Sequence, residues 1–148
     1  METVIFDIHG TIADINHRLH FISGDKKDWA KFHVECINDK PIKSTISLLQ
    51  SLHSTGHEII FLTAGPEISR DLERLWIEKH IPKIFNDYQL LMRKSRDYRP
   101  DDIVKLEILE REGLTPDKVL FIVDDRNRVV KALRNKGYKV LQPQEGDY

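Results

Sequence analysis

Cysteine is nearly absent from the sequence, since Cys36 is the only one. A single cysteine excludes an internal disulfide and a zinc site built from cysteines, and it fits a reducing compartment. Long hydrophobic runs are also missing, because no stretch approaches the roughly 20 apolar residues of a membrane span, and the start METVIFDIHG has no secretory pattern. We therefore expect a cytoplasmic protein that does not engage a membrane.

The sequence also lacks an excess of one charge. Its formal net charge is −1 although 32% of its residues are charged, so no strong field attracts nucleic acid, and a polynucleotide substrate would need local basic contacts. A length of 148 residues with 40% hydrophobic content suits one compact core. Because repeats, low-complexity tracts and linkers are missing too, we expect a single domain over residues 1–148.

Short apolar runs that end at or near polar residues are the main pattern that is present. They predict buried parallel strands at residues 4–6, 58–63, 88–92, 119–124 and 138–141. Helical patterns lie between them, at residues 41–54, 66–80, 101–113 and 126–137. This alternation predicts an α/β fold, a doubly wound (Rossmannoid) parallel sheet of about five strands with helices on both faces.

Residues 12–40 interrupt this alternation and are predicted to form a small cap insertion after the first strand. Residues 28–37 are expected to form one amphipathic helix with Trp29, Phe32 and Val34 available for packing. Trp29 has two possible uses, because an indole can pack in the insertion or stack on a nucleobase. Packing is the simpler expectation for it.

Polar residues follow three of the predicted strands. Asp7 and His9 follow the first, Thr63 ends the second, and Asp124 and Asp125 end the fourth. Ligands bind at the carboxyl ends of strands in open α/β sheets. Adjacent buried carboxylates need a cation nearby, and Mg²⁺ with its preference for oxygen ligands suits them. A lone Asp125 would more simply cap the next helix, but two acids together with Asp7 favour a metal.

These motifs resemble, in order, those of the haloacid dehalogenase (HAD) superfamily. VIFDIHGT is similar to its first motif, Asp-x-Asp-Gly-Thr, and VLFIVDDR to its fourth, while Thr63 and Lys105 match the second and third. The resemblance implies that Asp7 is the nucleophile and that Lys105 neutralises the phosphate and the nucleophile. It further implies two groups of binding residues: Gly10, Thr11, Thr63 and Ala64 for phosphate, and Asp7, the His9 backbone carbonyl, Asp125 and, in support, Asp124 for Mg²⁺.

Within the superfamily the chain most resembles the 3′-phosphatase domain of phage polynucleotide kinase-phosphatases. The likeness lies in Arg18, in the RPDDIVKLEIL segment and in the ending VLQPQEGDY. It implies that Arg18 and Asp101 also belong to the substrate site. The second motif departs from the pattern, because Gly65 stands near the place where that group has a phosphate-binding arginine.

His9 occupies the position of the family's second aspartate, the general acid/base. Acid/base assistance is typically worth about 10²–10⁴-fold, and a histidine can transfer protons near neutral pH, but its ring is longer than a carboxylate. From the sequence alone, the change His9→Asp is expected to activate the enzyme.

Three functions are compatible with these residues. The first is a Mg²⁺-dependent phosphomonoester hydrolase that works through an aspartyl phosphate on nucleotide or polynucleotide 3′-phosphate ends. The others are a 5′(3′)-deoxyribonucleotidase and a catalytically silent phosphate- or nucleotide-binding module. Further polar residues could meet a substrate but are as well explained as solvated: His17, His20, Lys26, Lys94, Arg96 and Arg99.

Overall fold

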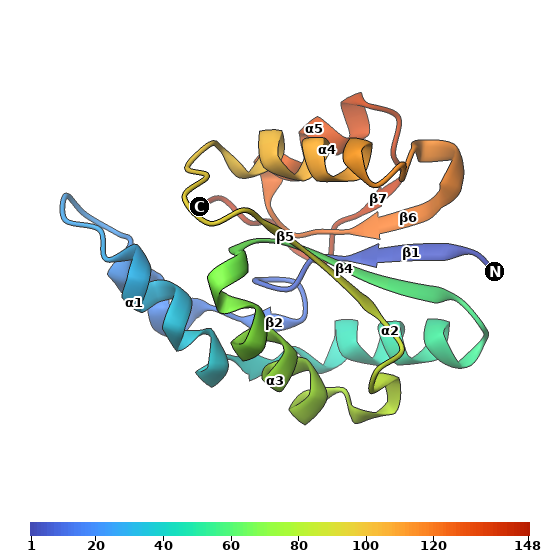
Figure 1. Cartoon of the computed structure of the whole chain (residues 1–148), viewed down its shortest axis with the longest axis horizontal. Helices are drawn as coiled ribbons and strands as arrows, with labels where there is room; N and C mark the ends of the chain where they lie inside the picture. The colour runs from blue at the N-terminus through green and yellow to red at the C-terminus, as the bar shows by residue number, and fades with distance from the viewer.

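A five-stranded parallel sheet forms the centre of the protein, and the computed structural model describes all of its residues, Met1–Tyr148. The strand order is β5-β4-β1-β6-β7 (Figure 1). The strands are β1 (Thr3–Phe6), β4 (Glu58–Pro66), β5 (Gln89–Arg93), β6 (Val119–Val123) and β7 (Val140–Leu141). The predicted doubly wound α/β fold is thereby confirmed.

Helices cover both faces of the sheet (Figure 1). Helices α2 (Lys43–Ser54) and α3 (Arg70–His80) pack on one face, and α4 (Asp101–Arg111) and α5 (Asn127–Asn135) pack on the other. Alternation along β1 divides the core, because Val4 and Phe6 join the first cluster and Ile5 joins the second. Since β1 pairs with both β4 and β6, the residues after β1 lie in the middle of the carboxyl edge.

The predicted ends of the elements shift by a few residues. Strand β4 continues to Pro66, and its pairing with β5 is irregular between Thr63 and Pro66. Single 3₁₀ turns occur at Glu67–Ser69, which precedes α3, and at Pro82–Ile84 and Pro116–Lys118. No helix has the length and apolar character that a membrane crossing needs.

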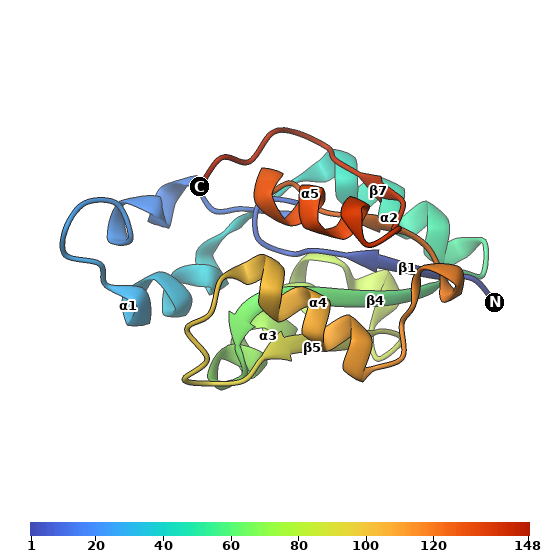
Figure 2. The same ribbon diagram turned by 90° about the horizontal axis from the view of Figure 1, so that it is seen from above.

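The insertion lies at the opposite end of the molecule from the N-terminus (Figure 1 and Figure 2). Its two ends are joined by the antiparallel pair β2 (Ala13–Asp14) and β3 (Lys40–Pro41). Between them stand a 3₁₀ helix (Asn16–Phe21), α1 (Trp29–Val34) and a second 3₁₀ helix (Glu35–Asn38).

The expected single helix over residues 28–37 is wrong, because the α-helix ends at Val34. Of the three residues expected to pack, Phe32 is buried, whereas Trp29 is 49% exposed and Val34 56% exposed. Trp29 is the first residue of a helix capped by Asp28, whose side chain accepts a hydrogen bond from the Lys31 amide. The indole therefore remains accessible at the edge of the insertion.

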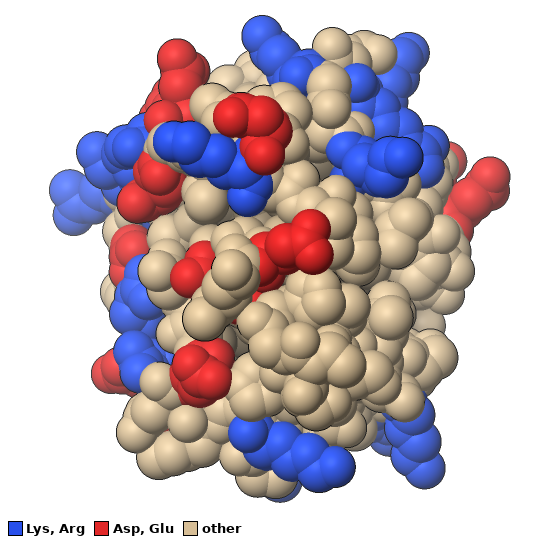
Figure 3. Space-filling view, turned by 90° about the vertical axis from the view of Figure 1, so that its right-hand side faces the viewer, with Lys and Arg blue, Asp and Glu red and all other residues tan.

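Acidic and basic side chains are interspersed on the side of the molecule shown in Figure 3. This view agrees with the formal net charge of −1. This side carries the N-terminus and lies opposite the insertion (Figure 1), and it offers no field of a single sign.

Candidate active site

Lys105 joins the ends of two neighbouring strands. Its Nζ donates to Asp7 Oδ1 at 2.9 Å and to Asp124 Oδ2 at 2.6 Å. Asp7 follows β1 and Asp124 follows β6, while Lys105 comes from α4. All three are buried, and the most exposed of them, Asp7, is 5% exposed. A lysine on a helix is most often solvated. Lys105 is instead buried, and it bridges two carboxylates.

Asp125 completes a cluster of three carboxylates with Asp7 and Asp124, whose oxygens lie within 4.8 Å of one another. The Thr11 hydroxyl lies between two of them, 3.0 Å from Asp7 Oδ2 and 3.2 Å from Asp125 Oδ1. Gly10 allows this approach, because a Cβ there would lie 2.2 Å from Asp125 Oδ2 and its φ is +87°. The turn after β1 is therefore shaped around Asp125.

The charges in this cluster do not balance. Three ionised carboxylates and one lysine leave two negative charges in a buried site. Burial, only partly opposed by Lys105, raises the pKa of Asp7 to about 6, and burial together with Asp7 raises the pKa of Asp124 to about 6. A divalent cation with oxygen ligands supplies the missing charge, so the residues present fit Mg²⁺.

The hydrogen bonds distinguish the two adjacent acids. Asp124 accepts from Lys105 on one oxygen and from the Arg126 amide, at 3.0 Å, on the other. Asp125 accepts only from the hydroxyls of Thr11 and Tyr148. Hydroxyls can rotate away, whereas an ammonium and a fixed amide cannot easily be replaced. Asp125 is thus the better direct ligand and Asp124 the better support.

His9 has a partner that the sequence did not reveal. Its Nε2 lies 2.5 Å from Oε1 of Glu73, a residue of α3 that is 2% exposed. Burial alone would raise the pKa of Glu73, but the charge and hydrogen bond of His9, with Arg18, bring it below the usual value. Glu73 is therefore an ionised group that holds the imidazole. Its position one helical turn before the buried Trp76 and Ile77 is the signal that could have found it.

The second motif lies against this pair. A Cβ on Gly65 would lie 3.3 Å from His9 Cε1 and 3.3 Å from Thr63 Oγ1, so the glycine leaves room for the imidazole. The Thr63 hydroxyl accepts from the Gly65 amide at 3.0 Å and is fully buried. The threonine predicted to bind phosphate and the histidine predicted to act as acid/base are thus brought together.

Asp101 lies between two arginines that sequence reasoning passed over. Its carboxylate pairs with Arg93 and with Arg126. Arg93 also donates to the Ala64 carbonyl at 2.6 Å, which ties the end of β5 to the second motif. Both arginines follow the rule that polar residues at strand ends belong to the site, because Arg93 ends β5 and Arg126 follows Asp125 after β6.

Residues 142–148 fold back over the site from beyond the last strand. The Gln142 amide donates to the Asp125 carbonyl at 2.9 Å, and Gly146 approaches so closely that a Cβ would lie 2.7 Å from the same carbonyl. The Tyr148 hydroxyl lies 2.8 Å from Asp125 Oδ2 and 3.2 Å from the His9 carbonyl oxygen. Burial, Asp7 and Asp125 raise the pKa of Tyr148, so the phenol is a hydrogen-bond donor.

The structure gives Arg18 partners other than the carboxylate cluster. Arg18 is fully buried; its Nε and Nη2 donate to Asp39 at 2.8 and 2.7 Å, and its Nη1 donates to the Phe32 carbonyl at 2.9 Å. The Asp39 carbonyl in turn accepts from the Trp76 indole at 2.8 Å. In this arrangement the guanidinium holds the insertion together and onto α3, and a contact of Arg18 with substrate stays a prediction.

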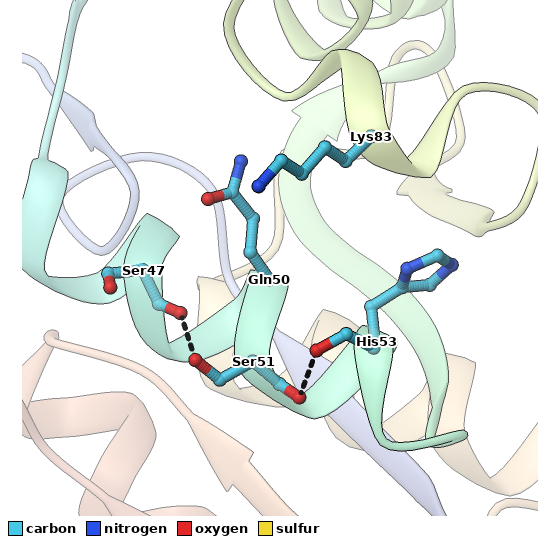
Figure 4. A pocket seen from close by; sticks show the side chains of 6 residues that line it. Ser47, Gln50, Ser51, His53 and Lys83 are labelled. Carbon is cyan, nitrogen blue, oxygen red and sulfur yellow. Dashed lines mark hydrogen bonds between the residues drawn. The ribbon is translucent and has the colours of Figure 1, made fainter.

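Other polar residues lie outside this cluster. Arg99 pairs with Asp97 and Glu107 on the surface, and His17 pairs with Asp39. A polar hollow of ≈490 Å³ lies between α2 and Lys83 (Figure 4). The Ser51 hydroxyl there bonds to the carbonyl of Ser47 in its own helix, and the hollow contains no residue of the carboxylate cluster.

The parallel sheet and the carboxylates and lysine gathered at its carboxyl edge define a phosphatase domain of the HAD superfamily. Within it, the chain belongs to the family of the polynucleotide kinase PNKP phosphatase domain, whose model matches residues 1–148.

Solved structures agree with this assignment. A chain of the Pnkp1/Rnl/Hen1 complex matches with a TM-score of 0.79 and 28% identity over 99% of this chain, which spans 47% of that one. The magnesium- and phosphate-bound D,D-heptose 1,7-bisphosphate phosphatase from B. bronchiseptica matches with a TM-score of 0.63 and 11% identity (96% of this chain, 80% of that one). A haloacid dehalogenase-like hydrolase from Streptococcus pneumoniae matches with a TM-score of 0.62 and 15% identity, over 96% of this chain and 84% of that one. The last two show the shared fold.

Proposed function

We propose that the chain is a Mg²⁺-dependent phosphomonoester hydrolase that forms an aspartyl phosphate on Asp7. The observation that carries this proposal is the Lys105 bridge, 2.9 Å from Asp7 and 2.6 Å from Asp124. It keeps a buried carboxylate beside a fixed positive charge, which is what a nucleophile toward an anionic phosphate needs. Mg²⁺, held by Asp7, Asp125 and the His9 carbonyl, would neutralise charge on the phosphoryl oxygens.

The reaction has two steps. An Asp7 oxygen forms a bond to phosphorus while the ester P–O bond breaks, and His9 gives a proton to the leaving oxygen. His9 then takes a proton from water, the resulting hydroxide bonds to phosphorus, and the Asp7–phosphorus bond breaks to release inorganic phosphate. Glu73 orients the imidazole in both steps, in the way a carboxylate orients a catalytic histidine elsewhere.

We further propose a polynucleotide 3′-phosphate end as the substrate. The family and the 28% identical chain, which belongs to an RNA repair complex, support this choice. So does the insertion, where Trp29 stacks on His33 with ring centroids 5.9 Å apart and Lys27 lies 6.0 Å above the indole. Exposed aromatic rings beside basic side chains are what single-stranded nucleic acid needs.

His33 connects this aromatic surface with the proposed acid/base. Burial and the charges of His9, Arg18 and Arg93 lower the pKa of His33 to about 4, so the imidazole is neutral at pH 7. Its Nδ1 is buried without a hydrogen-bond partner. A nucleic-acid strand whose terminal phosphate lies at Asp7 would thus pass the neutral imidazole of His33 before it reaches Trp29.

Phosphate release with Mg²⁺ tests the proposal on three substrates: a 3′-phosphorylated oligonucleotide, a 5′-mononucleotide and an aryl phosphate. We expect the oligonucleotide to have the highest kcat/KM. A preference for the mononucleotide would favour a deoxyribonucleotidase. Binding of Mg²⁺ and phosphate without turnover of any substrate would favour a silent module.

Trp29→Ala is expected to raise the KM for the oligonucleotide by about tenfold, because stacking on one aromatic ring contributes about 1–3 kcal/mol per base. The aryl phosphate should be hydrolysed as before. Direct binding can be followed too, since Trp29 is 49% exposed and the other tryptophan, Trp76, is 1% exposed. An unphosphorylated oligonucleotide should quench the fluorescence of Trp29 in the wild type, and this quenching should be absent from Trp29→Ala.

Two further variants serve as controls. Trp29→Phe keeps an aromatic surface and should retain most of the affinity. Phe85→Ala removes an aromatic ring that is 57% exposed outside the insertion, and it should change nothing. Equal oligonucleotide KM values in Trp29→Ala and Phe85→Ala would contradict the stacking role.

A further inference from the structure

Besides the nucleophile Asp7, the proposed function assigns two ligands to Mg²⁺, the Asp125 carboxylate and the His9 carbonyl oxygen. The Tyr148 hydroxyl contacts both of them. It lies 2.8 Å from Asp125 Oδ2 and 3.2 Å from the His9 carbonyl oxygen. It is also close to the turn after β1, because a Cβ on Gly10 would lie 2.5 Å from this hydroxyl. The phenol oxygen thus lies in the same small space as the two proposed ligands.

We propose that Tyr148 competes with the divalent cation for this site, so that cation binding requires its hydroxyl to leave. The inference rests on the proposed function, since it takes Asp125 and the His9 carbonyl as ligands of Mg²⁺. A Mg²⁺ ion lies about 2.0–2.1 Å from its oxygen ligands. An ion bound to both oxygens would meet the hydroxyl that now bonds to them, and it would repel the phenol proton that points at the same lone pairs.

The ring of Tyr148 is held separately from its hydroxyl. Arg126 Nε donates to the Tyr148 carbonyl at 2.6 Å, and its guanidinium lies 5.1 Å above the ring. Arg126 is itself paired with Asp101. Because Tyr148 as a whole is 41% exposed, the side chain has solvent to move into. Removing only the hydroxyl therefore leaves the anchoring contacts in place.

The nucleophile is poorly accessible in the present arrangement. Asp7 is 5% exposed and Asp125 1% exposed, which leaves little approach for a phosphate ester. Release of Tyr148 by the cation would open the side of the site next to Asp125. Metal loading would then precede entry of the substrate.

The test measures cation affinity rather than activity. Mg²⁺ is titrated into the metal-free full chain by calorimetry, and Mn²⁺ by electron paramagnetic resonance, for the wild type and for Tyr148→Phe. We expect the variant to bind both ions about three- to tenfold more tightly, the size expected when one hydrogen bond to a charged group no longer competes. An unchanged or weaker affinity would overturn the inference, because the hydroxyl would then be indifferent to the ion or would support it.

Two control variants separate this inference from the proposed function. Tyr98→Phe removes a hydroxyl from a side chain that is 89% exposed and should bind like the wild type. Asp125→Asn should bind the ions far more weakly. If Asp125→Asn keeps the affinity, the metal site and the inference both fail; if it loses affinity while Tyr148→Phe is unchanged, only the inference fails.

Displacement of the phenol can be observed directly. The chain has four tyrosines, so the signal of Tyr148 in a chain labelled with ¹³C at the tyrosine Cζ is the one missing from Tyr148→Phe. We expect this signal to move toward the position of an exposed tyrosine when Mg²⁺ is added. A signal that stays in place at saturating Mg²⁺ would contradict displacement.

Discussion

Asp7→Asn is expected to lower phosphate release by on the order of 10⁴–10⁶-fold, the loss seen when a catalytic nucleophile is removed. The asparagine side chain has the same shape but cannot attack phosphorus. Its amide can still meet Thr11, which lies 3.0 Å from Asp7 Oδ2, so the fold around it should persist. Steady-state phosphate release with the 3′-phosphorylated oligonucleotide measures the loss.

The same variant should be more stable than the wild type when no metal is present. Burial, opposed in part by Lys105, raises the pKa of Asp7 from 3.8 to about 6. The folded chain therefore holds this proton more tightly than the unfolded chain, and ionisation of Asp7 between about pH 4 and pH 6 destabilises the fold. Asparagine does not ionise.

Thermal unfolding of the two proteins checks this expectation. The advantage of Asp7→Asn should be small at pH 4, grow up to about pH 6 and stay level above it. Saturating Mg²⁺ should reduce the advantage, because the ion binds the wild-type carboxylate. If the variant unfolds at lower temperature than the wild type at pH 7, the cluster is not under the electrostatic strain that we infer. Lost activity would then have to be separated from lost structure.

His9→Ala is expected to lower kcat by about 10²–10⁴-fold, the usual contribution of a general acid/base, with little change in KM. Glu73→Ala should lower kcat as well, because the imidazole loses the partner 2.5 Å from its Nε2. Glu73→Gln keeps an acceptor oxygen and should recover part of the rate. If Glu73 has only a structural role, its variants should be less stable, but kcat should not be lowest in Glu73→Ala and partly recovered in Glu73→Gln.

The contact with Glu73 reverses the expectation for His9→Asp. An aspartate is shorter than the histidine, so it would leave the Glu73 carboxylate buried without its partner and add a second negative charge nearby. We expect the single variant to be slower than the wild type. If the double variant His9→Asp, Glu73→Gln exceeds the wild type tenfold or more, His9 is an impairing substitution and not a working acid/base.

The strands and the residues at their ends were predictable because both depend on local sequence. A run such as VLFIVDD combines burial with the acids that follow it, and parallel strands bring their carboxyl ends to one edge. The fold and the cluster of Asp7, Asp124 and Asp125 follow from this rule. Lys105 needed the family resemblance, because its own surroundings in the sequence are those of a solvated helix.

The residues that were missed depend on contacts across long stretches of chain. Glu73 is 64 positions from His9, and Tyr148 is 139 positions from it. The periodicity of α3 places Glu73 on the buried face, one turn before Trp76 and Ile77, but it does not identify His9 as the partner, and residues 142–148 have no period at all. Arg18 was assigned to substrate from the family resemblance, and its partner Asp39, 21 positions away, carries no signal of pairing in the sequence.

The insertion is held closed by two separate sets of contacts, and this affects how the enzyme can change over evolution. The β2–β3 pair joins its ends, and the buried ion pair of Arg18 and Asp39 locks its interior, so the exposed residues 23–28 form a loop between fixed points. Doubling the length of such a loop costs only about 0.6 kcal/mol. The length and composition of this tip can therefore diverge among relatives while the carboxyl edge of the sheet stays the same.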